Sequence, residues 1–377
     1  MEVVPLTARG GLVGLLAEDR DTREQRLRNL KALGASTGAQ SFANAHRVEW
    51  TCSEEAGKLA YAAALCSKSV YGGSDDRVEP PAILGCSSEL LGLIRPSGNG
   101  TLKASALFEI RERGGRTMLI ATIRGSASFS DWLVNFDNGL SPCPDLLNFS
   151  SESGSLTSHK GFSNCARAFL PQFTEQLASA LATARPPNQN IEVVFTGHSA
   201  GGAVAMLLYA HFLTNKRQYP MLSPHNLRFS CLTFGAPPIF NTDPTPLLDA
   251  LQARLPRPGH MLAFAAEGDP VSRMDGAYAA VVANLYYRAS AEDEDNPAEM
   301  ARVARELPWL SLYRLGKLVV LRDEAGWPDE LSVGAYVVGE GELGGWLWVN
   351  FFAHRKTVYM RWMGEVGMGH FNGRRRW

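Results

Sequence analysis

The sequence has few cysteines and no metal-binding motif. It holds six cysteines in 377 residues, and no two of them form a Cys-x-x-Cys pair. This spacing argues against a structural zinc site and against a disulfide scaffold. We therefore expect no metal and no cofactor. A reduced interior suits these cysteines best, while one or two disulfides stay open.

The sequence also has no excess of charge of either sign. It contains 37 basic and 38 acidic residues, for a formal net charge of −1. No overall field therefore favours nucleic acid or an anionic membrane, and we expect no nucleic-acid partner.

Long hydrophobic runs are missing as well. No window reaches the about 18 uninterrupted apolar residues that a membrane-spanning helix needs, so no transmembrane segment is expected. The apolar run from Leu12 to Ala17 is short, interrupted by glycine and preceded by the acidic Glu2. Because this is a poor secretory signal, we expect a non-secreted, cytoplasmic protein.

The length and the hydrophobic content of 45% predict one large domain with insertions. Residues 1–50 are expected to form a helical extension, with a charged helix at 18–33. Residues 51–377 are expected to form the main domain, with an insertion at about 276–350 that contains the acidic run "AEDEDNPAE".

Strand and helix patterns alternate along the main domain. A capping-box pattern of Thr51 and Glu54 predicts a helix over 56–65. The expected strands lie at 103–111, 117–124, 191–196, 227–234, 260–265, 317–322 and 333–338, with helices at 164–182 and after Ser199. This order predicts an α/β fold with a mostly parallel central sheet and helices on both faces.

One strand-to-helix junction carries a G-x-S-x-G pattern, Gly197-His198-Ser199-Ala200-Gly201. A nucleophile elbow holds its serine in a strained turn, so the residues two before and two after must be small to let strand and helix approach. Gly197 and Gly201 meet that need. Ser199 is therefore the candidate nucleophile.

A serine nucleophile needs a histidine base, an orienting carboxylate and oxyanion donors. Asp269 ends the apolar strand "HMLAFAAEGD", where the acid of such a triad belongs, whereas Asp243 and Asp275 lie outside strand ends. The alternative is that Asp269 only caps the turn at Pro270.

Four further landmarks occur in a fixed order: "IATIRGSASFSDWL", "HKGF", "FTGHSAGGAVAMLL" and "LTFGAPPIFN", followed by "EGDPVSRM". Together they cover about residues 103–275 and resemble the class 3, fungal-lipase-like lipases of the α/β-hydrolase superfamily. The resemblance implies an α/β-hydrolase fold and a serine carboxylester hydrolase that acts on acyl lipids through a Ser-Asp-His triad and an acyl-enzyme. Acylglycerol, phospholipid and galactolipid substrates all stay open.

The resemblance also implies the oxyanion donors. The family's oxyanion residue follows the first Arg-Gly pair, here Arg124-Gly125-Ser126. Ser126 and the backbone N–H of Ala200 would then hold the developing oxyanion. His159 and His198 are expected to pack or hydrogen-bond rather than react.

The base is either His354 or His370, the two histidines that follow Asp269. His354 precedes Tyr359 by five residues, which resembles the H-x-x-x-x-Y at the start of the family's last helix. His370 lies near a Gly-rich, charged C-terminus. We favour His354.

Residues 128–137 are expected to form a short amphipathic helix. Phe129, Trp132, Leu133 and Phe136 fall at i, i+3, i+4 and i+7. This face either packs permanently into the core or, as the family resemblance implies, forms a lid over Ser199 that makes transient contact with a lipid interface.

A different class of function is a lipase-like module that binds a ligand or partner without turnover. The complete set of serine, acid, base and oxyanion residues argues against it.

Overall fold

The computed structural model describes residues 19–44, 48–72, 77–96, 104–125, 139–147, 156–183, 190–222, 227–288, 307–308, 310–324 and 332–371. The predicted amphipathic helix at 128–137 and the acidic run at 291–299 lie outside these residues.

A nine-stranded sheet forms the centre of the molecule, in the order β1-β11-β10-β9-β8-β7-β4-β3-β2. Its middle strands, from β4 through β7, β8 and β9 to β10, are parallel, and both edges are antiparallel. The strands are β1 (Val48–Glu49), β2 (Cys86–Ile94), β3 (Ser105–Glu112), β4 (Thr117–Ile123), β7 (Ile191–His198), β8 (Leu227–Phe234), β9 (Met261–Ala266), β10 (Lys317–Asp323) and β11 (Val333–Val337). A separate two-stranded sheet pairs β5 (Leu140–Pro142) with β6 (Thr157–His159).

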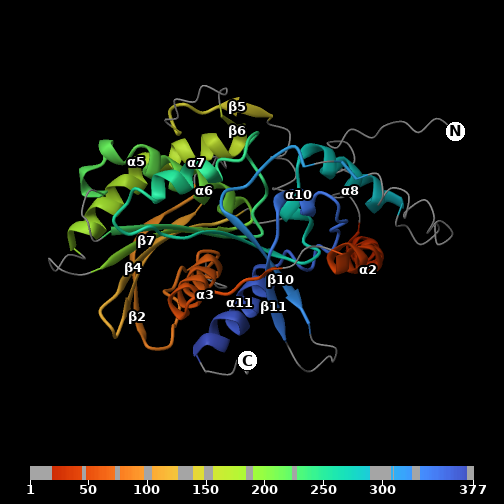
Figure 1. Cartoon of the computed structure of the whole chain (residues 1–377), viewed down its shortest axis with the longest axis horizontal. Helices are drawn as coiled ribbons and strands as arrows, with labels where there is room; N and C mark the ends of the chain where they lie inside the picture. The colour runs from red at the N-terminus through yellow and green to blue at the C-terminus, as the bar shows by residue number, and fades with distance from the viewer. Residues whose placement is uncertain are drawn as a thin grey trace.

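Helices cover both faces of the central sheet. In Figure 1, α5, α6 and α7 lie above it, and α3 and α11 lie below it. This arrangement confirms the predicted α/β class. The helices are α2 (Arg20–Asn44), α3 (Glu54–Ser69), α5 (Lys160–Thr183), α6 (Ala200–Thr214), α7 (Thr245–Gln252), α8 (Gly276–Arg288), α10 (Glu340–Leu343) and α11 (Lys356–Phe371), with 3₁₀ turns η2 (Lys216–Gln218), η3 (Pro220–Leu222) and η4 (Pro270–Arg273).

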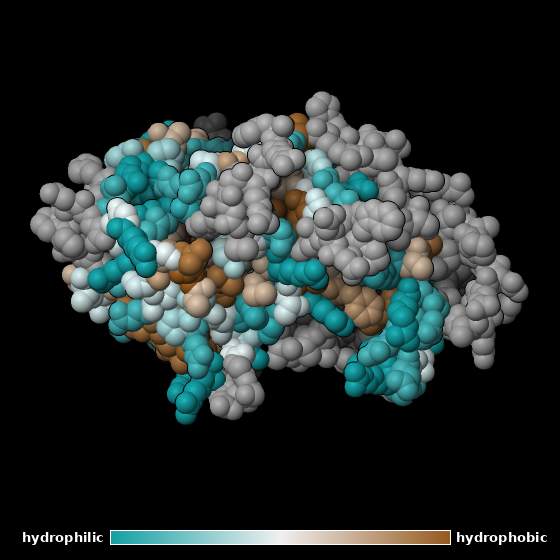
Figure 2. Space-filling model, turned by 90° about the horizontal axis from the view of Figure 1, so that it is seen from below, coloured by the Kyte–Doolittle hydropathy of each residue, from teal (hydrophilic) through white to brown (hydrophobic). Residues whose placement is uncertain are grey.

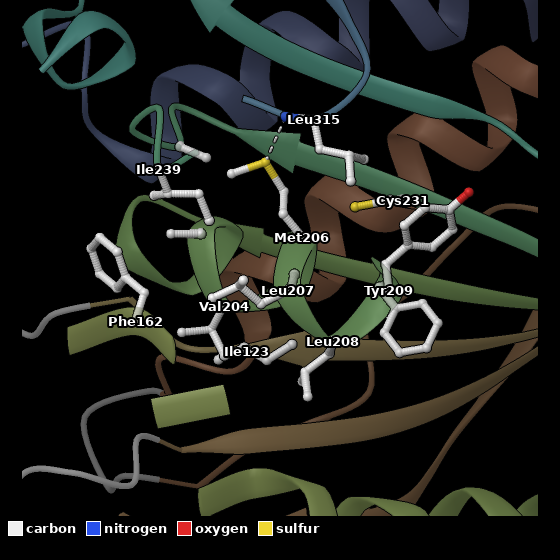
Figure 3. Packing of buried hydrophobic residues seen from close by; sticks show 14 of the residues in the cluster. Ile123, Phe162, Val204, Met206, Leu207, Leu208, Tyr209, Cys231, Ile239 and Leu315 are labelled. Atoms are coloured by element: carbon white, nitrogen blue, oxygen red, sulfur yellow. Dashed lines mark hydrogen bonds between the residues drawn. The ribbon is translucent and has the colours of Figure 1, made fainter. Parts of the chain in front are cut away.

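The strand and the helix that flank Ser199 are buried in the core. Every residue of β7 is buried, as is typical of a parallel strand covered on both faces. Helix α6 is buried from Ala200 to Leu213. Figure 3 shows α6 inside this core, where the Met206 sulfur accepts a hydrogen bond from the backbone N–H of Leu315 at 3.2 Å. Helix α6, which follows the candidate nucleophile, is therefore surrounded by other parts of the protein.

Two local features differ from the sequence prediction. Ser53, not Thr51, is the N-cap of α3, and its Oγ accepts from the N–H of Ala56 at 3.2 Å. The capping-box pattern missed this because α3 begins at Glu54, so only the residue directly before it has the extended backbone of a cap. The edge strand β2 was not expected, although its residues alternate in burial.

The predicted insertion contributes to the central sheet, because β10 pairs with β9 and β11 pairs with β10. The N-terminal helix α2 lies against α8, where the guanidinium of Arg26 donates to the backbone oxygen of Tyr286 at 3.2 Å. The division into an extension at 1–50 and a main domain at 51–377 stays a prediction.

Figure 2 shows the face seen from below, where hydrophobic surface is divided into separate areas among hydrophilic side chains. Among the described residues, the exposed large hydrophobic side chains lie on different segments: Val48, Leu84, Leu91, Leu140 and Leu247. Among the residues with a described position, no helix is long and apolar enough to span a membrane. All six cysteines are free.

Candidate active site

Ser199 lies in a strained turn between β7 and α6. Its φ of 60° and ψ of −134° make it the one non-glycine residue with positive φ in the described part of the chain. Such a conformation costs about 1–3 kcal/mol and persists only where the surroundings enforce it. A Cβ on Gly197 would overlap the backbone of Gly201, and a Cβ on Gly201 would overlap the carbonyl of Ile123. The glycines of the G-x-S-x-G pattern are therefore required by close packing.

His354 lies against Ser199. Its Nε2 is 2.9 Å from the Ser199 Oγ, and its Nδ1 is 2.9 Å from Oδ2 of Asp269. An ionised carboxylate only accepts hydrogen bonds, so Nδ1 carries the proton and donates to Asp269. Nε2 is then free to accept from the serine hydroxyl. This is the tautomer that a general base requires.

Asp269 is fully buried at the end of β9. Its Oδ1 accepts from the backbone N–H of Val271 at 2.8 Å, and its Oδ2 accepts from the Ser272 hydroxyl at 3.4 Å. The bond to Val271 is the turn cap that the sequence offered as an alternative. Asp269 therefore both caps η4 and contacts His354.

Tyr359 supports the same carboxylate from α11. Its hydroxyl donates to Oδ2 of Asp269 at 2.6 Å and accepts from the N–H of Ala266 at 2.9 Å. Burial first, and then the charge of Asp269, raise the pKa of Tyr359 well above its ordinary value. Its hydroxyl therefore stays protonated as a donor. The five-residue spacing between His354 and Tyr359 places both around one acid.

A hydrogen-bonded chain joins His198 to both sides of the site. His198 Nε2 donates to the backbone oxygen of His354 at 2.7 Å, so its Nδ1 accepts from the Tyr71 hydroxyl at 3.1 Å. The Tyr71 hydroxyl in turn accepts from the N–H of Gly125 at 3.1 Å. Burial, followed by the nearby His354, lowers the pKa of His198 well below its usual value. His198 is therefore a neutral connector, in line with the packing role expected for it.

The structure brings together Ser199, Asp269 and His354. Ala200 begins α6, and the first N–H groups of a helix have no acceptor within that helix. His370 lies in the last turn of α11, roughly 20 Å of helix away from its start near His354. The side chain of His370 lies outside the described residues, as do Ser126 and the residues of the predicted lid: Phe129, Trp132, Leu133 and Phe136.

Sequence reasoning missed Tyr71 and Ser272. Tyr71 lies 127 residues from His198 and 54 residues from Gly125, so no local pattern connects them. Ser272 lies within "EGDPVSRM", and its position three residues after Asp269 in a 3₁₀ turn is the signal that was available. No group of three possible metal ligands occurs in the part of the chain that the structure describes.

Comparisons with known proteins find similarity to lipases. Residues 120–279 match the family model for lipase (class 3). A secreted mono- and diacylglycerol lipase from Fusarium solani is 25% identical over 126 residues, which are 33% of this chain. The match spans only 32% of that relative's length.

The solved structure of the Lip2 lipase from Yarrowia lipolytica has a TM-score of 0.51 and 16% identity to this protein. The match covers 81% of this chain and 93% of the other. This likeness shows the fold, and the predicted α/β-hydrolase fold is confirmed.

The prediction of a cytoplasmic, non-secreted protein is wrong, because the Fusarium relative is a secreted lipase. The weak apolar run at residues 12–17, which lies outside the described residues, does not decide the location. Ordinary composition does not separate the two locations, because a mature secreted domain buries the same kind of core. Residues 120–279 of this chain are therefore similar to the class 3 lipases.

Proposed function

We propose that this protein is a serine carboxylester hydrolase that acts on acyl lipids. The observation that carries the proposal is the hydrogen-bonded line from the Ser199 Oγ through His354 to the buried Asp269, with 2.9 Å at each step. The strained backbone of Ser199 adds support, because it costs stability and places the hydroxyl at the helix N-terminus, against His354.

In the proposed reaction, the Ser199 Oγ attacks the ester carbonyl carbon while His354 Nε2 takes its proton. Asp269 holds the resulting imidazolium in place. The tetrahedral intermediate collapses, and His354 gives the proton to the departing alcohol. Water then attacks the acyl-enzyme with His354 again as the base, which releases the fatty acid and restores Ser199.

The developing oxyanion is proposed to lie between the N–H groups of Ala200 and Ser126. One fixed donor of this kind contributes about 3 kcal/mol to lowering the barrier. The bond from the Gly125 N–H to Tyr71, at 3.1 Å, supports the idea that the loop leading into Ser126 is held in one position.

The helix proposed at 128–137 is a lid, with Phe129, Trp132, Leu133 and Phe136 on the side that covers the acyl pocket in water. Turning that side onto a lipid surface would open the site, so we propose transient contact with a lipid interface.

A fluorophosphonate probe tests the function. We expect the probe to label the native protein at Ser199, located by mass spectrometry, and not to label the Ser199→Ala variant. Ser163→Ala is the matched control, because Ser163 is buried, bonded to Ser158 and far along the chain from the site. Labelling in Ser163→Ala should persist.

Absence of labelling at Ser199 would contradict the proposal and favour a lipase-like binding module without turnover. Hydrolysis of p-nitrophenyl esters of graded chain length, followed by natural acylglycerols, phospholipids and galactolipids, then defines the substrate.

A further inference from the structure

Two cations lie on the ring of Tyr71, beside the candidate active site. The Lys356 ammonium is 3.8 Å from the ring centroid, and the Arg124 guanidinium carbon is 5.6 Å from the same centroid. Arg124 follows β4, and Lys356 begins α11. The fold therefore brings cations from two distant segments onto one aromatic side chain.

These cations are close to the reacting groups. The hydroxyl of Tyr71 is bonded to the N–H of Gly125, and a Cβ built on Gly125 would be 3.2 Å from the Ser199 Cβ. Lys356 follows His354 by two residues. A headgroup attached to an ester at Ser199 would therefore lie within reach of both cations.

Their placement is unfavourable for the fold itself. Lys356 occupies the first turn of α11, where the helix dipole disfavours a cation, and that turn contains no acidic residue. Burial first, and then the charges of Arg124 and Lys68, lower the pKa of Lys356. Among the salt bridges between described residues, none joins Arg124 or Lys356 to a carboxylate.

The acidic residues in the first turn of the neighbouring helix α3 lie far from the N-terminus of α11. Gly367 of α11 packs against Tyr61 and the carbonyl of Gly57 in α3, so the two helices run antiparallel. The N-terminal turn of α3, with Glu54 and Glu55, is therefore distant from Lys356, and Glu54 pairs with Lys58 at 2.6 Å. The Tyr71 ring attracts both cations, but among the described residues no carboxylate pairs with either of them to offset their mutual repulsion. A cation placed at a helix N-terminus and close to a second cation is unfavourable for folding, and such placements are expected at functional sites.

We propose that Arg124 and Lys356 form a subsite for the net-anionic, phosphate-bearing headgroup of an acyl-lipid substrate. The inference rests on the proposed function, because the headgroup is the part of the substrate next to the ester at Ser199. The guanidinium supplies paired donors that match phosphate oxygens, and Lys356 supplies a point charge. The N-terminus of α11 adds favourable dipole and N–H groups for an anion.

Two short-chain phospholipids with the same acyl chains and different net headgroup charge test the proposal. Dihexanoyl-phosphatidylglycerol and dihexanoyl-phosphatidylcholine are compared below their critical micelle concentrations, so that binding to an interface plays no part. We expect kcat/KM to favour the anionic lipid by about tenfold, as loss of a charge-assisted contact predicts. The Arg124→Gln/Lys356→Gln variant should bring the ratio close to one.

Lys317→Gln is the matched control for each single Gln variant, because Lys317 is exposed on β10 and its substitution removes one positive charge elsewhere. It should leave the ratio unchanged. The ratio is taken within each variant, so a general loss of activity does not affect it. Thermal unfolding checks that the double variant is folded, and the two single variants replace it if it is not. Equal kcat/KM for both lipids in the unmodified protein would overturn the headgroup subsite while leaving an ester hydrolase.

A binding measurement separates this inference from the proposed function. Calorimetric titration of Ser199→Ala with the anionic lipid needs no turnover, and we expect the two further Gln substitutions to weaken binding about tenfold. Unchanged binding would overturn the subsite even if no ester is hydrolysed. If inorganic phosphate binds Ser199→Ala as tightly as the lipid and the substitutions abolish both, the cations bind free phosphate and the headgroup assignment is wrong.

Discussion

Tyr71→Phe tests whether the hydrogen-bonded chain through His198 positions the candidate active site. The substitution keeps the ring and removes one hydroxyl. That hydroxyl donates to His198 Nδ1 and accepts from the Gly125 N–H, each at 3.1 Å. Its loss leaves the Nδ1 of His198 and the backbone N–H of Gly125 without this partner. His198 lies beside the candidate base, and Gly125 precedes the candidate oxyanion residue.

The expected magnitudes follow from those contacts. An unsatisfied buried polar group costs about 1–3 kcal/mol. The two groups left without a partner belong to His198 and Gly125, which are both buried, so the free energy of unfolding should fall by about 2 kcal/mol or more. A direct oxyanion donor is worth about 3 kcal/mol of barrier. Tyr71 acts through its neighbours, so we expect kcat to fall about tenfold with little change in KM.

The assay combines urea unfolding with steady-state hydrolysis of p-nitrophenyl butyrate. Tyr209→Phe is the matched control. Tyr209 is a fully buried tyrosine on α6, and its hydroxyl bonds to Gln252, outside the candidate active site. This control should lose comparable stability and keep its kcat. If Tyr71→Phe also lost stability and kept its kcat, the chain through His198 would be structural only, and the positioning argument would be refuted.

Ser199→Ala and His354→Ala should each abolish ester hydrolysis, and the double variant should be hardly slower because these residues act as a unit. His370→Ala should reduce the rate of p-nitrophenyl ester hydrolysis only mildly. If His370→Ala abolished this activity and His354→Ala did not, the base would be His370. The pKa of His198 is lowered in the folded protein. Below about pH 6.5 its imidazole is therefore protonated in the unfolded chain and stays neutral in the folded protein. The free energy of unfolding should then drop by up to about 1.4 kcal/mol per pH unit as pH falls, with a shallower slope in His198→Gln by urea unfolding; identical slopes would refute this assignment. Specific activity should rise when substrate passes from monomers to micelles, and Trp132→Ser should weaken that rise more than hydrolysis of a short soluble ester; equal loss of both activities would favour a helix packed permanently in the core.

Local patterns were sufficient for the parts of the site that depend on neighbouring residues. The elbow at Ser199 was predictable because its two glycines are needed two residues before and two after the strained turn. Asp269 was predictable because an apolar strand ends just before it. The capping residue of α3 was not, because Thr51 and Ser53 both offer a hydroxyl, and only the backbone conformation of Ser53 decides between them.

The sequence alone determined the α/β class, the nucleophile elbow and the order of the family landmarks, because these follow from periodicity and from steric needs within a few residues. It left the base open between His354 and His370. Only the tertiary structure placed His354 within 2.9 Å of Ser199, joined Tyr71 to His198 and Gly125, and brought Arg124 onto the same ring as Lys356. These contacts join residues from 53 (Arg124 and Tyr71) to 285 (Lys356 and Tyr71) positions apart. They depend on how whole helices pack across the sheet, and no local pattern in the chain encodes them.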